Sequence, residues 1–219
     1  MTRAGIFAAL LVWAACGSPI EVQPDGGTDA DAASSGGLTL SFAIDPEVPG
    51  DLFPGATLDD VDLAIKDLRL TGDAASATDD RTRAPFLDLE WKSDTAPRPA
   101  MFPTAPPGRY SKIAFKLEND TGDAFRIHGT ILWFDGQVHP FEIEDDNGVD
   151  ISVPMDVTLP VGDKAGDTLE VHMVGIFAGI DWQNAKLDDD GTVKVTSDTD
   201  LHEVRDRFGG AFSAASITH

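Results

Sequence analysis

Cysteine is almost absent from this chain, because Cys16 is the only one among 219 residues. A disulfide within the chain is therefore excluded, and the hydrophobic core alone must hold the fold together, even outside the cytoplasm. Basic residues are also few, with 16 Lys and Arg against 38 Asp and Glu, so the net charge is −22. This charge opposes binding to nucleic acid and to anionic lipid, whereas it favours solubility and cationic partners.

Catalytic signatures are missing as well. The sequence contains no G-x-S-x-G motif, no Walker loop, no Rossmann fingerprint and no H-E-x-x-H motif. A carboxylate pair for glycoside hydrolysis cannot be recognised among 38 acidic residues. We therefore expect a protein that is not an enzyme.

The apolar run near the start is too short to cross a membrane. Residues 4–15 are an uninterrupted stretch of apolar residues and glycine after Arg3, whereas a membrane span needs about 20 residues. This layout is typical of a signal peptide. Two alanines precede Cys16, and the stretch resembles a bacterial lipobox, whose cysteine is acylated and becomes the mature N-terminus. Trp13 stands where an aliphatic residue is usual, and an ordinary signal peptide cut near Gly17 is the alternative.

A lipid on Cys16 predicts a protein anchored at the bacterial outer membrane or cell surface, with the periplasmic face as an alternative. Each buried CH₂ of an acyl chain such as palmitate contributes about 0.8 kcal/mol, so two or three chains hold a protein firmly. Residues 1–15 are then the lipoprotein signal peptide. Residues 16–37 form an acidic linker, rich in Gly, Ala and Ser, that we expect to be disordered. Residues 38–219 form a single folded domain.

From Leu38 onward the apolar residues recur with a period of two, which is typical of half-buried strands. Long loops are expected at 45–60, 72–84 and 93–108, because Pro, Gly and polar residues gather there. The expected strands cover residues 38–44, 61–70, 86–91, 110–117, 125–134, 138–143, 149–157 and 169–173, with shorter ones at 193–195 and 211–218. We expect an all-β fold, an antiparallel β-sandwich of about eight strands with an immunoglobulin- or transthyretin-like look and one short C-terminal helix.

Local patterns add detail to this expectation. The apolar face of the strand at 61–70 switches between Ile65 and Leu68, which predicts a β-bulge. Tyr110 follows a turn, and its hydroxyl should reach a backbone group. Asp135-Gly136 predicts a two-residue type I′ hairpin turn.

That turn predicts that His128 and His139 lie on one face, about 13 Å apart, so that they cannot share a metal ion.

Near the end of the chain, Asp200 and Glu203 predict a capping box. It starts a two-turn helix at 201–208, which we expect to stop at Gly209-Gly210.

The turn Pro106-Pro107-Gly108-Arg109-Tyr110, the strand at 61–70 and the signal together resemble a group of uncharacterised bacterial lipoprotein β-sandwiches. These are domains of unknown function, and the likeness covers roughly residues 38–174. The strand at 169–173, the apolar crossover after it and the C-terminal helix also resemble the MbnP-like periplasmic proteins, which are associated with copper and a di-haem partner. The paired C-terminal histidines of that group are missing here.

Two acidic turns are candidate calcium sites. They comprise Asp145 and Asp146 before Asn147-Gly148, and Asp188, Asp189 and Asp190 before Gly191. Neither is an EF-hand, because the residues five positions before the glycines are Ile143 and Lys186. Asp, Asn and Gly are also the residues expected from turn chemistry alone. Calcium therefore stays an alternative, and no other cofactor is expected.

His202 and Asp206 are a second metal candidate, since residues at i and i+4 lie on one face of a helix. Zinc normally takes three or four protein ligands, however, and a solvated helix face is the alternative.

We expect a non-catalytic cell-envelope lipoprotein that binds another envelope protein or a glycan. A metal-related periplasmic binding protein, for copper or calcium, is the first alternative. A carbohydrate-binding or hydrolase domain is the second, and it requires exposed tryptophans beside two carboxylates. Trp91, Trp133 and Trp182 are the candidates, although Trp91 shares a strand face with Leu87 and Leu89, which favours the core.

Overall fold

The computed structural model describes residues 37–74, 79–183, 185–196 and 200–216. The signal peptide, Cys16 and residues 16–36 of the expected linker lie outside the described residues. None of the described helices is long and apolar enough to cross a membrane. The elements are β1 (Gly37–Asp45), β2 (Gly50–Phe53), β3 (Ala56–Gly72), η1 (Asp80–Thr82), β4 (Arg83–Trp91), β5 (Ala100–Phe102), β6 (Gly108–Leu117), β7 (Phe125–Leu132), β8 (Val138–Asp145), β9 (Val149–Leu159), β10 (Lys164–His172), α1 (Met173–Phe177), β11 (Lys186–Leu187), β12 (Val193–Val195), α2 (Leu201–Ala211) and β13 (Phe212–Ser216).

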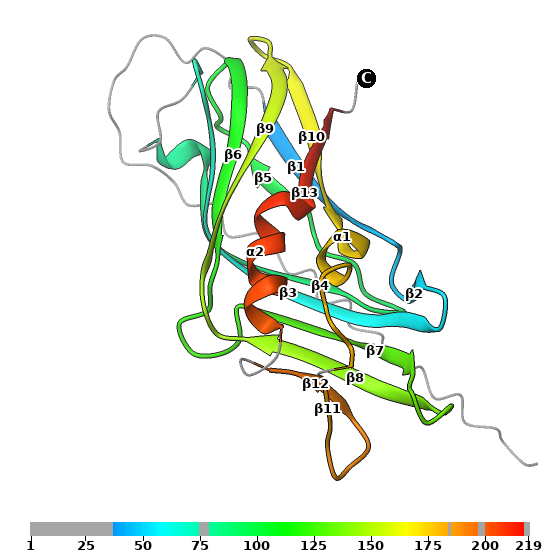
Figure 1. The fold of residues 1–219 in the computed structure, drawn as a ribbon. Helices are drawn as coiled ribbons and strands as arrows, with labels where there is room; N and C mark the ends of the chain where they lie inside the picture. The colour runs from blue at the N-terminus through cyan, green and yellow to red at the C-terminus, as the bar shows by residue number, and fades with distance from the viewer. Residues whose placement is uncertain (1–36, 75–78, 184, 197–199, 217–219) are drawn as a thin grey trace, which may run out of the picture. The chain divides into compact units, whose positions relative to one another are not determined.

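The strands form two sheets, and the expected all-β sandwich is confirmed (Figure 1). The smaller sheet has the order β13-β10-β1-β5, and the larger has the order β11-β12-β8-β7-β3-β6-β9, with β2 and β4 also paired to β3. Most neighbouring strands are antiparallel, as expected, but β1 pairs with β10 and β12 pairs with β8 in parallel. Parallel pairing needs a long crossover. The chain between β1 and β10 supplies one by first building most of the larger sheet.

The short strands β2 and β5 lie inside segments that the sequence predicted as loops. Each forms by pairing with a longer strand: β2 pairs with the start of β3, and β5 pairs with β1. Their few residues carry too little alternation to be recognised locally. The clear alternation at 149–157, by contrast, corresponds to β9, whose residues alternate between buried and exposed.

The hydrophobic core lies between the sheets and continues under α2. Phe208 of α2 packs against Phe125 of β7, with ring centroids 4.6 Å apart, and Phe212 of β13 packs edge-on against Phe115 of β6 at 5.1 Å. Figure 1 shows α2 beside β9, over the larger sheet. The C-terminal elements therefore cover a part of the larger sheet that the smaller sheet leaves open.

The predicted bulge in β3 is confirmed. Its register against β6 shifts between Lys66 and Arg69, and Asp67 has a φ of 55°. This left-handed residue reverses the alternation, so that Ile65 and Leu68 are both fully buried.

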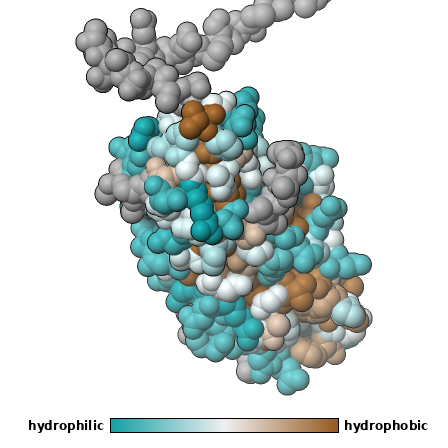
Figure 2. Space-filling model, turned by 90° about the horizontal axis from the view of Figure 1, so that it is seen from above, coloured by the Kyte–Doolittle hydropathy of each residue, from teal (hydrophilic) through white to brown (hydrophobic). Residues whose placement is uncertain are grey.

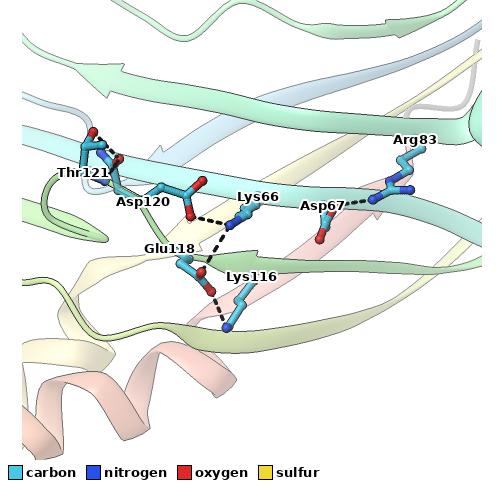
Figure 3. A network of polar contacts seen from close by, with 8 residues as sticks. Lys66, Asp67, Arg83, Lys116, Glu118, Asp120 and Thr121 are labelled. Carbon is cyan, nitrogen blue, oxygen red and sulfur yellow. Dashed lines mark hydrogen bonds and ion pairs between the residues drawn. The ribbon is translucent and has the colours of Figure 1, made fainter.

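The bulge also directs charged side chains to one surface, as Figure 3 shows. Lys66 Nζ lies 3.3 Å from Glu118 Oε1 and also contacts Asp120, while Lys116 contacts the second oxygen of Glu118. These ion pairs are partly exposed to water and contribute little to stability, so the fold there depends on the apolar side of β3.

Tyr110 behaves as predicted. Its hydroxyl donates a 2.7 Å hydrogen bond to the carbonyl oxygen of Pro106, and its side chain is fully buried. Burial, followed by the nearby Asp79 carboxylate, raises the pKa of Tyr110 to about 12. The turn leading into β6 is therefore closed by a buried phenol.

The predicted type I′ turn between β7 and β8 is wrong. Leu132 pairs with Val138, and the loop is closed by the Trp133 N–H, which donates to the Gln137 carbonyl oxygen at 2.8 Å. Asp135 accepts a 2.9 Å hydrogen bond from the Gln137 N–H, which favours this longer loop.

The longer loop shifts the predicted register by one residue, which changes the partner of every residue in the hairpin. His128 therefore lies opposite Glu142 and not Ile143. His128 and His139 lie on opposite faces of the hairpin, and not on the same face as predicted.

The predicted capping box is also wrong. Asp200 is the N-cap of α2, but its side chain makes no capping hydrogen bond among the described residues. Its Oδ2 instead accepts a 2.6 Å hydrogen bond from the Asp181 N–H, in the segment after α1.

The helix likewise continues through Gly209-Gly210 to Ala211. Ala211 is buried and extends the apolar face by a further three residues beyond Phe208. Tertiary packing there outweighs the poor helix propensity of glycine.

Candidate functional site

Large apolar side chains are exposed at the tip of the β7–β8 hairpin. Leu132, Phe134 and Val138 are 56%, 66% and 65% exposed. With neighbouring residues they line two adjacent hollows of about 560 and 320 Å³. We call this region the end surface and define it by six residues: Phe53, Pro54, Leu132, Phe134, Val138 and Trp182. Figure 2 shows, on one face of the protein, how apolar residues gather in few places on a largely hydrophilic surface.

The end surface rests on a packed aromatic base. Trp182 is half-buried and stacks on Phe177, with an interplanar angle of 14° and a centroid distance of 6.1 Å. Phe141 meets the same indole edge-on at 5.6 Å, and Phe53 lies 6.3 Å from it. Because these rings come from separate elements, the apolar surface is preformed and does not depend on one loop.

The rim of the end surface is acidic. The exposed side chains of Asp51 and Asp181 line the two hollows, and Asp135 lies in the hairpin loop. No Lys or Arg is among the described residues that line either hollow. A partner here meets an apolar centre surrounded by negative charge.

Charged residues occupy the outer face of the larger sheet, next to the end surface. Strand register places one row across four strands, Asp60–His128–Glu142–Lys194. Residues two positions along lie on the same face. They form a second row, Asp62–Arg126–Glu144.

His128, Glu142 and Glu144 are the described residues whose arrangement could hold a metal ion. One ligand atom from each lies within 4.8 Å of the others, and no other such group is found in the part of the chain that the structure describes. His128 Nε2 is 3.9 Å from Glu144 Oε1. Burial, and then the adjacent Glu142 carboxylate, raises the pKa of Glu144. Lys194 Nζ lies 3.6 Å from Glu142 Oε1, so an ion here competes with an ammonium group.

A polar hollow of about 280 Å³ adjoins the second row. Arg126 lines it and donates two hydrogen bonds to Asp62 Oδ2, at 2.8 and 3.2 Å. Burial, followed by Asp62, raises the pKa of Asp88 in its wall. The guanidinium already neutralises Asp62, and no aromatic residue is among the described residues lining the hollow.

Asp145, from the first predicted calcium turn, is the carboxylate of a buried ion pair. Its side chain is 1% exposed, and its Oδ2 accepts a 2.8 Å hydrogen bond from Arg205 Nε of α2. Its Oδ1 accepts hydrogen bonds from the backbone and side-chain nitrogens of Asn147, at 2.9 and 2.7 Å. Asp146 is exposed beside it. The structure therefore gives Asp145 a structural role that sequence reasoning missed.

In the second predicted calcium turn, a carboxylate accepts a hydrogen bond from the backbone of the same turn. Asp190 Oδ1 accepts a 2.9 Å hydrogen bond from the Thr192 N–H, which lowers the pKa of Asp190. Asp188 lies 3.5 Å from Lys194, and Asp189 is exposed. The structure does not bring these carboxylates together with those of the first turn.

The helical candidates are not joined by a third ligand among the described residues. His202 and Asp206 are both exposed on α2, and His202 Nε2 lies 3.5 Å from Glu203. His172 points outward as predicted, and its Nε2 lies 2.8 Å from Ser213 Oγ. A metal at the predicted residues stays a prediction that the geometry does not favour.

The three candidate tryptophans differ in how far they are buried. Trp91 is 5% exposed and belongs to the core, as its strand face predicted. Trp133 and Trp182 are half-buried. The hollow that Trp182 lines holds one described carboxylate, Asp181, and not the two that a glycosidase requires.

The sequence matches no family model and no curated protein. Among solved structures, the chain is similar to MbnP from Methylosinus trichosporium, with 11% identity and a TM-score of 0.42. The match covers 75% of this chain and 82% of that chain. A likeness of this degree carries no argument about function.

Proposed function

We propose that this protein is a lipid-anchored, non-catalytic interaction module of the bacterial envelope, and that its end surface binds another envelope protein. The observation that supports this proposal is the exposure of Leu132, Phe134 and Val138 together over a packed aromatic base. Contiguous exposed apolar surface bordered by polar residues is typical of interaction sites. Aromatic anchors at the centre of such a site supply most of the binding free energy.

The acidic rim indicates the chemistry of the partner. An apolar segment flanked by Lys or Arg would fill the centre and pair with Asp51 at the edge. A second copy of this chain would bring the same acidic rim and a net charge of −22, so self-association is opposed. Anionic lipid is opposed for the same reason.

The direction of β1 supports a partner away from the anchored end. The described chain enters at Gly37, the first residue of β1, and β2 with Phe53 follows the far end of that strand. A strand of this length spans about 26 Å. The end surface is therefore separated from the point at which the chain enters the sandwich.

Site-specific photo-crosslinking in intact cells tests the partner. A photoreactive residue at position 134 should give one dominant protein adduct, whereas the same residue at Val161, which is 70% exposed elsewhere, should not. Phe134→Ser with Val138→Thr should weaken binding of the identified partner by more than about tenfold, because truncating a central anchor costs over 1 kcal/mol. Val161→Ser is the matched control.

Three results contradict the proposal. These are equal adducts at positions 134 and 161, an adduct with glycan and no protein, and a partner whose affinity the double substitution leaves unchanged.

The anchor is tested separately. Cys16→Ser should move the protein from the membrane fraction to the soluble fraction, because the acyl chains can no longer be attached. Mass spectrometry of the mature N-terminus should show the acyl mass on the wild type. An unchanged membrane fraction, or cleavage downstream of Cys16, would remove the anchor from the proposal and leave the end surface to be judged by crosslinking.

A further inference from the structure

We infer that His128, Glu142 and Glu144 form a binding site for one divalent transition-metal ion of the zinc type on the outer face of the larger sheet. This site goes beyond the proposed function and is independent of the end surface. It also differs from the metal sites that the sequence predicted, none of which includes these three residues.

Strand geometry brings the ligands together. His128 and Glu142 are direct cross-strand partners in the β7–β8 hairpin, and Glu144 lies two residues further along the same face. The three ligand atoms lie within 4.8 Å of one another. In a tetrahedral zinc site with bonds of about 2.0–2.2 Å, ligand atoms lie about 3.3–3.6 Å apart. The side chains are 34%, 27% and 36% exposed, so small rotations can close this difference.

The donor set selects the class of ion. One imidazole nitrogen and two carboxylate oxygens suit zinc and its neighbours, whereas calcium prefers an all-oxygen set of six to eight ligands. The partial exposure of the three side chains leaves coordination positions for water or for a group from a partner.

A third carboxylate lies beside the histidine, where a group that orients its ring is needed. Asp60 of β3 pairs with His128 on the side opposite Glu142. Its Oδ1 is buried and has no hydrogen-bond partner among the described residues. A metal-bound histidine normally donates its other ring N–H to a carboxylate, and that bond holds the ring in place. The Asp60 Oδ2 lies 3.7 Å from Lys92 Nζ, which leaves Oδ1 as the oxygen that can accept the ring N–H of His128.

Lys194 competes with the metal ion for the carboxylate of Glu142. Its ammonium group lies 3.6 Å from Glu142 and 3.5 Å from Asp188, so it can turn to Asp188 when a metal binds. This exchange predicts that removing the lysine strengthens metal binding, while removing any of the three ligands weakens it.

The test is calorimetric titration of the full chain, purified without chelator, with zinc chloride. We expect one zinc per chain. His128→Ala, Glu142→Gln and Glu144→Gln should each weaken binding by more than about tenfold. Lys194→Ala should strengthen it by up to about fivefold, which corresponds to the upper end of the range for an exposed ion pair.

His172→Ala is the matched control, since His172 also has two carboxylates within 4 Å, Asp45 at 3.7 Å and Glu170 at 3.9 Å. It should leave zinc affinity unchanged. Circular dichroism checks that each variant folds, and cobalt(II) absorption distinguishes a coordinated ion from a hydrated one. The inference is overturned by non-saturable zinc binding, by binding that survives His128→Ala, or by equal losses in His128→Ala and His172→Ala.

Discussion

The buried pair between Asp145 and Arg205 allows a quantitative test of how α2 is held to the sheet. These residues are 60 positions apart in the sequence, and the Asp145 side chain is 1% exposed. Arg205 Nε donates to Oδ2 at 2.8 Å, while Asn147 donates to Oδ1. Arg205→Met keeps most of the side-chain volume but leaves the carboxylate without its cation.

The expected cost follows from the burial of the carboxylate. Removing one partner of a buried ion pair destabilises a protein by about 3–5 kcal/mol, because the other charge stays buried. The two hydrogen bonds from Asn147 remain and Arg205 is 28% exposed, so we expect the lower end, about 3 kcal/mol. Asp145→Asn with Arg205→Met removes both charges and keeps an oxygen for Asn147. Asp145→Asn alone should cost about 1 kcal/mol, and the double variant should also lose only about 1 kcal/mol, which gives a coupling energy of about 3 kcal/mol.

Urea unfolding, followed by circular dichroism, measures the free energy of unfolding of the four chains in the cycle. Arg207→Met, two residues along the same helix, is the control. Arg207 is exposed and donates one 3.3 Å hydrogen bond to the Gly175 carbonyl oxygen, so its loss should cost less than about 1 kcal/mol. Because both oxygens of Asp145 are already bonded, calcium should not raise the unfolding midpoint. A coupling energy below about 0.5 kcal/mol, or an Arg205→Met variant as stable as the control, would refute the reasoning.

Three further substitutions test other parts of the fold. Asp167 is 1% exposed, and burial raises its pKa. The folded state therefore favours the protonated Asp167 side chain. The stability that this protonated group contributes is fully present below the unfolded pKa of about 3.9 and is lost as the pH rises through the folded pKa. Asp167→Asn should be about 1 kcal/mol more stable than wild type near pH 7, with no advantage near pH 3, in urea unfolding at both pH values. Asp67→Val should lower the free energy of unfolding by about 1–2 kcal/mol, because a β-branched residue is disfavoured at a φ of 55°. Asp67→Asn should have a much smaller effect. Equal free energies of unfolding for the two variants would contradict the claim that the left-handed backbone at position 67 disfavours a β-branched residue. Asp135, followed by the Gly191 carbonyl, raises the pKa of His139, so the stability that this histidine adds is present below about pH 6.5 and is lost as the pH rises through the folded pKa. His139→Gln should therefore destabilise the protein more near pH 6 than near pH 9 in thermal melts, and a pH-independent difference would refute the assignment.

Much of the secondary structure could be predicted from the sequence, because alternation depends only on which residues are apolar. The strands at 38–44 and 149–157 correspond to β1 and β9. The face switch between Ile65 and Leu68 located the bulge for the same reason. The hydrogen bond from the Tyr110 hydroxyl could also be predicted, because its acceptor is a carbonyl oxygen only four residues away in the sequence.

The candidate metal site could not be predicted in this way. Its residues are recognisable as outward-facing only when the hairpin register is known, and the register depends on the loop at Trp133–Gln137. A shift of one residue separates His128 from Glu142. The exposed Leu132 and Phe134 raise the same difficulty, because an apolar residue in a strand gives no sign of whether another element covers it.

The amino-acid sequence by itself determined that the chain has no disulfide, carries a large negative charge and builds strands with a period of two, since composition and alternation need no knowledge of partners. Only the tertiary structure decided the parallel pairing of β1 with β10, the burial of Asp145 against Arg205 and the convergence of one histidine with two glutamates. Each of these joins segments that are distant in sequence or whose alignment depends on a loop. The free energy that selects them comes from packing the whole sandwich and not from any local pattern.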